Sequence, residues 1–176
     1  MGTSEFDEAY EDEPGQLERE EESLGQAILD ATIRDLAPKP AGTLGEMATI
    51  RAAVDLMLEQ KLGAIIVGRE GQPVGIFTER DLMRRVVAAG IGLDRALEEV
   101  MTPEPETLGL DDGIAYALNR MTVGGFRNIP IVDDEDTLVG IISQREVVHY
   151  IVSLLPGHVI NLPPLPDLEA RHKHGG

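Results

Sequence analysis

Apolar and polar positions in the middle of the chain follow an order that occurs twice. Each copy opens with apolar residues spaced three and four apart, the period of an amphipathic helix. A continuous apolar run follows, typical of a buried strand, and then a polar turn and a second apolar run. The pattern predicts helices over residues 50–57 and 114–121, strands over 64–67, 74–77, 129–132 and 138–142, closing helices over 79–88 and 144–154, and a short strand ahead of each copy near 42–44 and 107–108.

The later parts of the two copies align directly. Ile66–Asp81 and Ile131–Glu146 match without a gap at seven of sixteen positions. The middle of the chain is therefore a tandem duplication of an α-β-β-α unit of roughly 60 residues. A unit this small has too little core alone, so we expect an α+β fold in which two small sheets pack face to face about a pseudo-twofold axis. Thr49 and Asp112 are the predicted N-caps of the opening helices.

A hydroxyl residue ends each second strand, three positions before an acid. The pairs are Thr78 with Asp81, and Ser143 with Glu146. This is the spacing of a capping box, which alone would explain it. It also suits a ligand, because a helix N-terminus attracts anions and a carboxylate accepts hydrogen bonds from ribose hydroxyls. The sequence leaves both interpretations open.

The regions outside the repeat differ from it in composition. Residues 1–22 hold ten acids against one base, Arg19, with few apolar positions, which predicts a disordered or partly helical acidic arm. Three prolines between positions 163 and 166 favour an extended tail. We divide the chain into a disordered acidic arm (1–23), a first unit (24–92), a second unit (93–158) and a Pro-rich tail (159–176).

Composition narrows the classes of function. The absence of Cys excludes disulfides, thiolate metal sites and Cys nucleophiles. A formal net charge of −17 disfavours binding to nucleic acid or to anionic membranes. No apolar run approaches the roughly 18–20 residues of a spanning helix, and the first residues lack the pattern of a secretory signal. We therefore expect a soluble, cytoplasmic protein.

The sequence shows no evident catalytic constellation. All four His residues lie after position 148, and none pairs with an obvious nucleophile. The usual nucleotide-hydrolase, dinucleotide, esterase and zinc-protease motifs are missing. The acidic run Asp133–Asp136 lacks the Gly and the distal Glu of a calcium loop, so a β-turn is expected there. We expect no catalytic residue and no metal site formed by the protein.

The repeat, with GIFTERD (75–81) and GIISQRE (140–146) closing each second strand, resembles a tandem pair of cystathionine β-synthase (CBS) domains, called a Bateman module. The resemblance covers roughly residues 30–155, and IRDLAPKP and EEVMTPEP stand where the segments leading into each domain stand in that family. It implies a non-catalytic regulatory module that binds AMP, ADP or ATP in two clefts between the units, with Mg²⁺ accompanying ATP. An S-adenosylmethionine sensor and a structural scaffold without a ligand are the alternatives.

The resemblance also implies roles for individual residues. The hydroxyl and acid of each motif are implied to contact phosphate and ribose, and the apolar residue two positions before the hydroxyl packs near the base. An Arg just before the core strand of the second unit is implied to reach the phosphates. The full set of implied ligand-binding residues is Ile76, Thr78, Arg80, Asp81, Arg127, Ile129, Pro130, Ile141, Ser143, Arg145 and Glu146.

Departures from the family pattern make the two sites unequal. Glu146 replaces the usual Asp, and Arg127 has Leu62 as its counterpart in the first unit. We therefore expect the second site to favour more highly phosphorylated nucleotides. Arg80 and Arg145 either serve across the cleft or lie on the surface, and Lys61 is a further candidate charge.

Pairs of modules in this family usually associate, so the resemblance implies a homodimer. We place the apolar helical face that it would bury near Val54–Met57 and Leu82–Val86. The sequence does not identify the effector that would respond to the ligand.

Overall fold

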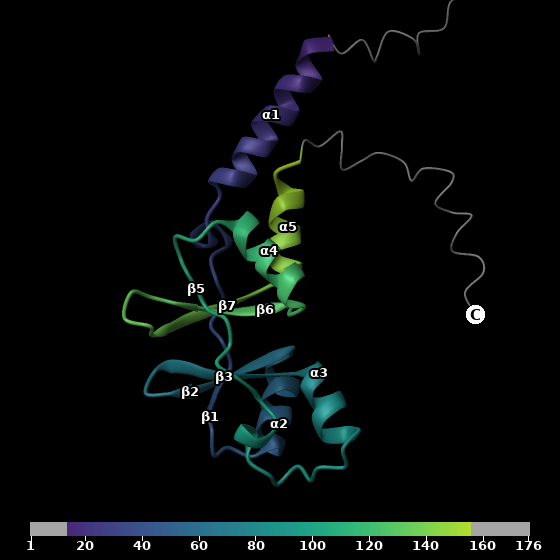
Figure 1. The fold of residues 1–176 in the computed structure, drawn as a ribbon, viewed down its shortest axis with the longest axis vertical. Coiled ribbons are helices and arrows are strands. Elements are labelled where there is room, and N and C mark those ends of the chain that lie inside the picture. The colour runs from purple at the N-terminus through teal and green to yellow at the C-terminus, as the bar shows by residue number, and fades with distance from the viewer. Residues whose placement is uncertain (1–13, 156–176) are drawn as a thin grey trace, which may run out of the picture.

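The computed structural model describes residues 14–155 of the 176-residue chain. Two small sheets form the body, one with strand order β1-β2-β3-β4 and the other with order β5-β6-β7. The sheets face each other, and each has helices on its outer side (Figure 1). This is the α+β arrangement that the repeat predicts. The expected tail (159–176) lies outside the described residues.

The bounds of the elements follow the predicted order closely. Ahead of the first unit lie α1 (Pro14–Asp30) and the 3-10 helix η1 (Ile33–Leu36). The first unit contains β1 (Thr43–Gly45), α2 (Ile50–Gln60), β2 (Ala64–Arg69), β3 (Gln72–Thr78), α3 (Glu79–Asp81) and the π-helix η2 (Leu82–Val87). After it come η3 (Leu97–Glu99), β4 (Thr102–Pro103), β5 (Leu108–Gly109), α4 (Ile114–Gly124), β6 (Asn128–Val132), β7 (Leu138–Ser143) and α5 (Gln144–Ser153).

The starts of α2 and α4 differ. The hydroxyl of Thr49 accepts from the Ala52 amide at 3.2 Å, so the predicted N-cap of α2 is confirmed. The prediction for α4 is wrong, because Gly113 holds the cap position without a side-chain hydrogen bond. Asp112 lies one residue earlier and accepts from the Gly109 amide at 2.8 Å, which closes the turn between β5 and α4.

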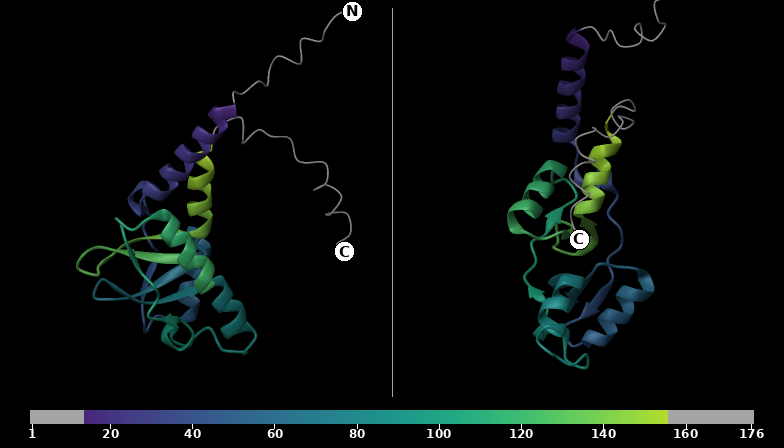
Figure 2. Two further views of the ribbon diagram at one scale, coloured as in Figure 1. Left: turned by 45° about the horizontal axis from the view of Figure 1, so that its top comes forward. Right: turned by 90° about the vertical axis from the view of Figure 1, so that its right-hand side faces the viewer.

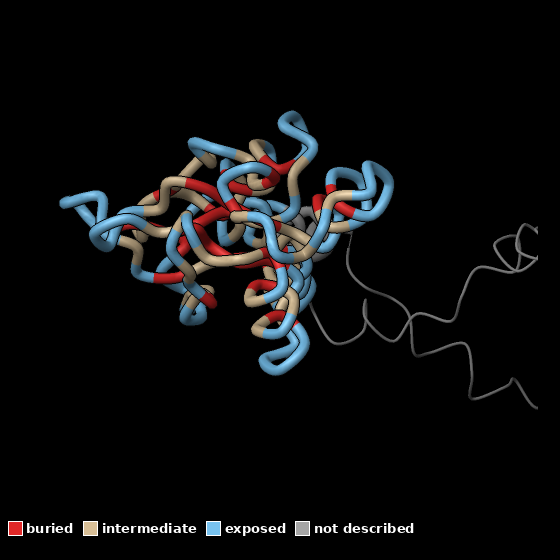
Figure 3. The backbone as a smooth tube through the Cα atoms, turned by 90° about the horizontal axis from the view of Figure 1, so that it is seen from below, coloured by how far each residue is buried: buried red, intermediate tan, exposed pale blue. Residues whose placement is uncertain are grey.

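Each unit repeats one sheet topology. A short strand pairs in parallel with the central strand, which pairs in antiparallel with the next: β1-β2-β3 in the first unit and β5-β6-β7 in the second. A small apolar cluster joins the sheets, with Ile66 and Ile76 of the first unit beside Leu138 and Ile141 of the second. Buried stretches of the chain run through the centre of the molecule, and shorter ones lie toward its margins (Figure 3).

Each segment that leads into one unit packs against the core of the other unit. We call residues 31–42 the first linker and residues 96–107 the second linker. Ala31 and Ile33 of the first linker are buried in the core of the second unit, whereas Leu97 and Val100 of the second linker are buried in the core of the first. The boundaries drawn at residues 24–92 and 93–158 thus follow the repeat, but each core includes part of the other unit's linker.

Part of the expected acidic arm is helical. Residues 14–23 form the beginning of α1, which stands away from the body of the second unit (Figure 2); residues 1–13 lie outside the described residues. Leu24 and Ile28 are half-buried, one helical turn apart, and Ala31 anchors the chain in the second core. Attachment to the body at one end explains why these residues are helical, which is the second of the two alternatives that their composition predicts.

The exposed apolar face differs from the predicted one by about one position. Met57 and Val86 point into the core of the first unit, while Leu58, Met83 and Val87 are exposed. Val148 and Val152 of α5 are also exposed, and they lie 65 residues after Met83 and Val87. The same pair of apolar positions is therefore exposed on both units. None of the helices in residues 14–155 is long and apolar enough to cross a membrane.

Candidate functional site

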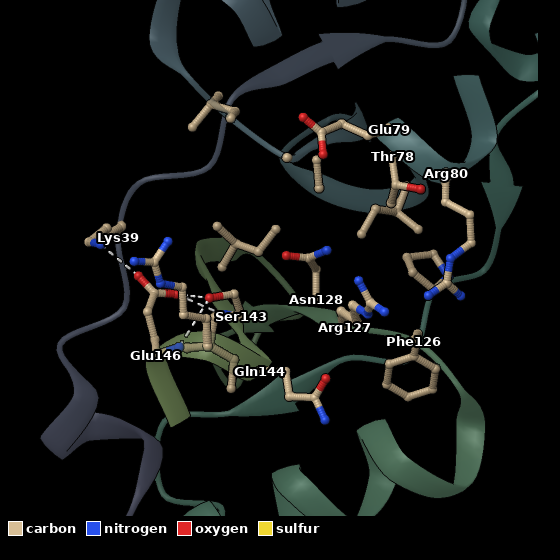
Figure 4. Close-up of a pocket in the computed structure, with 18 of the residues that line it drawn as sticks. Lys39, Thr78, Glu79, Arg80, Phe126, Arg127, Asn128, Ser143, Gln144 and Glu146 are labelled. Atoms are coloured by element: carbon tan, nitrogen blue, oxygen red, sulfur yellow. Dashed lines mark hydrogen bonds and ion pairs between the residues drawn. The ribbon is translucent and has the colours of Figure 1, made fainter. Parts of the chain in front are cut away.

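One continuous cleft of about 1940 Å³ lies between the units and contains both motifs. Thr78 and Asp81 line it from the first unit, and Ser143 and Glu146 from the second. Both linkers line it as well, so each motif faces a segment that leads into the opposite unit. Figure 4 shows Arg127 and Asn128 lying between the two motifs.

Thr78 and Asp81 form a reciprocal pair at the end of β3. The amide and hydroxyl of Thr78 donate to Oδ2 of Asp81 at 3.0 and 2.7 Å, and the Asp81 amide donates to the Thr78 hydroxyl at 3.2 Å. The predicted capping box is confirmed. Because one carboxylate oxygen makes both contacts, Oδ1 stays available to another donor.

That donor is Arg85, which the sequence analysis missed. Its Nε lies 3.3 Å from Oδ1 of Asp81, and its Nη1 donates to the carbonyl oxygens of Val100 and Met101 at 3.1 and 2.6 Å. Arg85 therefore connects the motif of the first unit to the second linker. An acid followed four positions later by Arg on a helix is the signal that points to this pair.

Ser143 and Glu146 repeat the arrangement at the end of β7. The amide and hydroxyl of Ser143 both donate to Oε2 of Glu146 at 2.8 Å. The longer Glu side chain thus makes the contacts that Asp81 makes in the first unit. Its Oε1 lies 2.7 Å from Nζ of Lys39 on the first linker, a second residue that sequence reasoning missed (Figure 4).

Opposing effects set the pKa of Glu146. Partial burial raises the pKa, while hydrogen bonds from Lys39 and from the hydroxyl and amide of Ser143 lower it. The hydrogen bonds prevail, so the pKa of Glu146 lies below its ordinary value. The carboxylate is therefore ionised at neutral pH.

The first glycine of each motif marks the place where a linker crosses a strand. A Cβ on Gly140 would lie 2.9 Å from the Lys39 carbonyl oxygen, and a Cβ on Gly75 would overlap the Met101 sulfur. The Ile141 amide also donates to the Lys39 carbonyl at 3.0 Å. The close approach explains why both motifs begin with glycine.

The predicted apolar residues separate into two groups. Ile76 and Ile141 line the cleft, as expected for residues beside a ligand. Ile129 is fully buried in the core of the second unit, and Pro130 is buried in β6; neither lines the cleft. The strand β6 thus contributes to the cleft only through its first residue, Asn128, and Arg127 just before the strand lines the cleft as well.

The predicted cations all line the cleft. Arg80 reaches across the units, and its Nη1 donates to the carbonyl of Gly125 in the turn after α4 at 2.9 Å. Arg127 and Arg145 are exposed at its edge, and Lys61 lines it too. Of the two alternatives for Arg80, its contact with the opposite unit is made to a backbone carbonyl, and a role toward phosphate stays a prediction.

Positive charge is concentrated in the cleft relative to the rest of the protein. Among residues 22–155, whose side chains the structure describes, seven of the 12 Lys and Arg residues line it, but only six of the 21 Asp and Glu residues. Three of these acids already have cationic partners: Asp81 with Arg85, Glu146 with Lys39, and Glu106 with Arg120. In a protein of net charge −17, a cleft lined by slightly more cations than acids repels an anion less than the average surface does.

The described residues do not include a grouping of three or more His, Asp or Glu side chains that could hold a metal ion. The Asp133–Asp136 turn is closed instead by its own side chain, since Oδ1 of Asp133 accepts from the amides of Glu135 and Thr137 at 3.0 and 2.9 Å. This is the β-turn that the sequence predicts.

Comparison with protein families places these features in context. The CBS domain model matches twice, over residues 33–88 and 97–153, which together make up more than half of the chain. The chain belongs to the CBS domain family. The two CBS domains coincide with the two α-β-β-α units and contain both motifs.

Several curated relatives of this CBS domain pair are much longer proteins. The chain is 35% identical over 101 residues to the meiotically up-regulated gene 70 protein of Schizosaccharomyces pombe, a match that covers 57% of this chain and 14% of that protein. It also spans no more than 25% of the CBS domain-containing proteins of Arabidopsis thaliana that it matches.

Solved CBS structures share the fold. The CBS domain protein PAE2072 from Pyrobaculum aerophilum, complexed with AMP, matches with a TM-score of 0.63 at 24% identity, over 69% of this chain and 98% of that one. The CBS domain pair of protein MJ0100, in complex with 5-methylthioadenosine and S-adenosyl-L-methionine, matches with a TM-score of 0.64 at 22% identity, over 70% and 97%. At these identities the likeness is one of fold.

Proposed function

We propose that this CBS domain pair is a non-catalytic regulatory module that binds an adenine nucleotide, AMP, ADP or ATP, in the cleft between its units. The observation that carries the proposal is the placement of two hydroxyl–acid pairs in a cleft that holds seven of the 12 Lys and Arg residues among residues 22–155. Hydroxyl and carboxylate groups suit a ribose, and cations suit phosphate. The AMP complex of PAE2072 supports the same class of ligand.

Each motif supplies a ribose contact in this proposal. Asp81 and Glu146 accept hydrogen bonds from the ribose hydroxyls, and Ile76 and Ile141 pack against the base. Thr78 and Ser143 contribute their hydroxyls near the phosphate. The cap hydrogen bonds keep each carboxylate in place before a ligand arrives, which reduces the entropy lost on binding.

We assign the phosphate contacts to the cations that lie between the two motifs. Arg127 lies just before β6, and its counterpart in the first unit is Leu62, so we assign phosphate contact to the second site first. A guanidinium matches phosphate oxygens with paired donors. Arg80 and Arg145 add charge from the two motif helices. Mg²⁺ accompanies ATP as part of the ligand.

A second candidate ligand is S-adenosylmethionine. The MJ0100 complex is the observation that favours it, since that CBS pair holds S-adenosyl-L-methionine and 5-methylthioadenosine. The ribose contacts would be the same, but the cationic sulfonium would gain nothing from the Lys and Arg residues of this cleft. We therefore rank S-adenosylmethionine below the phosphorylated nucleotides as a ligand. We rank it above the alternative that the protein is a scaffold that binds no small molecule.

We also propose that the module is a homodimer in the cytoplasm, with an unidentified effector and without nucleic acid or membrane as a partner. The exposed pair Met83 and Val87 recurs as Val148 and Val152, so both units present an apolar stripe at equivalent positions. A second copy with the same internal symmetry offers a matching surface.

Thermal unfolding with added ligand tests the proposed function. AMP, ADP, ATP and S-adenosylmethionine are compared at equal concentration with adenine-free controls such as inorganic phosphate. A ligand at 100 times its Kd should add about 2.7 kcal/mol to the free energy of unfolding. No stabilisation by any of the four would favour the scaffold instead.

A further inference from the structure

Lys39 lies where a ligand of the second motif must compete with it. Its ammonium is 2.7 Å from Oε1 of Glu146, and Oε2 is taken by the amide and hydroxyl of Ser143. Both oxygens of the second ribose acid therefore already have donors. Each carboxylate oxygen accepts two hydrogen bonds, so Oε1 has room for one more donor. The two vicinal hydroxyls of a ribose need two acceptor sites and can both donate to Glu146 only if the ammonium moves away.

The backbone of Lys39 is fixed more firmly than its side chain. Its carbonyl accepts from the Ile141 amide at 3.0 Å, and the linker presses against Gly140. The side chain of Lys39 is 75% exposed, and its ammonium makes one ion pair among the described residues. The linker thus holds the ammonium within reach of Glu146, but a flexible exposed side chain can give way at low cost.

The first unit lacks an equivalent arrangement. The residue 65 positions after Lys39 is Glu104, which is an acid and offers Asp81 no counterion. Asp81 pairs instead with Arg85, whose guanidinium also donates to two backbone carbonyls. Of the two motif acids, only Glu146 is therefore paired with a cation that makes no other polar contact among the described residues.

We infer that Lys39 is a specificity-determining residue of the second site, where it sets how much binding free energy the ribose hydroxyls contribute. This inference rests on the proposed nucleotide function. An uncharged nucleoside must displace the ammonium from Glu146 and offers it no new partner. A nucleotide brings phosphate into the same cleft, so the displaced ammonium keeps an anion nearby. The second site therefore discriminates against bare nucleosides.

The test compares Lys39→Met with the parent protein, both carrying Asp81→Asn so that the second site is read alone. Calorimetry with adenosine and with 2′,3′-dideoxyadenosine separates the role of the hydroxyls from that of the base. Because an exposed ion pair is weak, we expect adenosine to bind about two- to fivefold more tightly to the Lys39→Met protein. The affinity for dideoxyadenosine should not change.

Arg34→Met is the matched control, because Arg34 lies on the same linker and forms an ion pair of the same 2.7 Å length with Asp111, outside the cleft. It should leave the adenosine affinity unchanged. Unchanged or weaker adenosine binding in Lys39→Met, in a protein that still binds AMP, overturns the inference and leaves the proposed function standing. Absence of AMP binding in the protein without substitutions overturns the proposed function, and the inference with it.

Discussion

The carbonyl oxygen of Lys39 lies against the α-carbon of Gly140, so close that an added Cβ would stand 2.9 Å from it. The same Cβ would stand 3.0 Å from Cβ of Pro38. The first linker can cross β7 only where a side chain is missing. The first residue of the second motif is therefore set by packing, while its hydroxyl and acid are available to a ligand.

Gly140→Ala should destabilise the protein by about 1–3 kcal/mol, because the linker must move to admit the methyl group. Chemical denaturation measures the loss. Gly92→Ala is the control, since nothing lies within 4 Å of a Cβ at that position; it should change stability by less than about 0.5 kcal/mol. Equal effects at the two positions would show that the linker is not pressed on β7.

Arg127→Ala should weaken ATP binding more than adenosine binding. A charge-assisted hydrogen bond to phosphate contributes about 1.5–3 kcal/mol, and adenosine cannot form it. Titration calorimetry gives both affinities. Arg69→Ala removes the same charge outside the cleft, where Arg69 pairs with Glu46, and should affect neither ligand. Equal losses for ATP and adenosine would assign Arg127 a packing role only.

Acidic substitutions in the repeated apolar stripe should produce monomers. Light scattering should give twice the 19.1 kDa chain mass for the unsubstituted protein and a single chain mass for Val87→Glu combined with Val152→Glu. Burying an unpaired carboxylate at each position would cost more free energy than the association of the two copies provides. Met47→Glu, at another exposed apolar position between β1 and α2, should remain dimeric. A dimer that survives the double substitution would place the interface elsewhere.

Glu146 should make stability depend on pH in the acidic range. Its pKa is lower in the folded protein than the ordinary value of about 4.3, so the stabilisation is complete above that value and is lost as the pH falls through the folded pKa. Glu146→Gln should therefore show a shallower fall in the free energy of unfolding below about pH 4.3. Lys39→Met should reduce the fall in part, because the hydrogen bonds from Ser143 remain. A Glu146→Gln profile as steep as that of the parent would contradict this.

Local patterns predict much of this molecule. The repeat gives the order of the elements, and the hydroxyl–acid spacing gives both capping boxes, at Thr78 and Ser143. The contacts concerned span three or four residues, so spacing along the chain is enough to define them. Thr49 is found for the same reason.

Long-range placement is harder to predict from the sequence. That each linker packs on the opposite unit depends on contacts between distant segments, and Lys39 meets Glu146 only because of this exchange. Ile129 and Pro130 belong to a strand that is buried on both sides, so their proximity to the motif in sequence does not bring them to the cleft. Arg85 follows a local rule, but its carbonyl partners lie in the second linker.

Direct measurement of AMP binding to a protein with both ribose acids replaced tests the central claim. Asp81→Asn and Glu146→Gln keep the size of each side chain while removing the charge that accepts from ribose. Calorimetry should show AMP binding to the unsubstituted protein and a loss of more than tenfold in the double variant, with the fold intact by circular dichroism. Thr49→Ala removes a helix cap outside the cleft, so it should lower stability by about 0.5–2 kcal/mol without changing AMP affinity. Unchanged AMP affinity in the double variant would show that the two acids only cap helices, and would contradict the account.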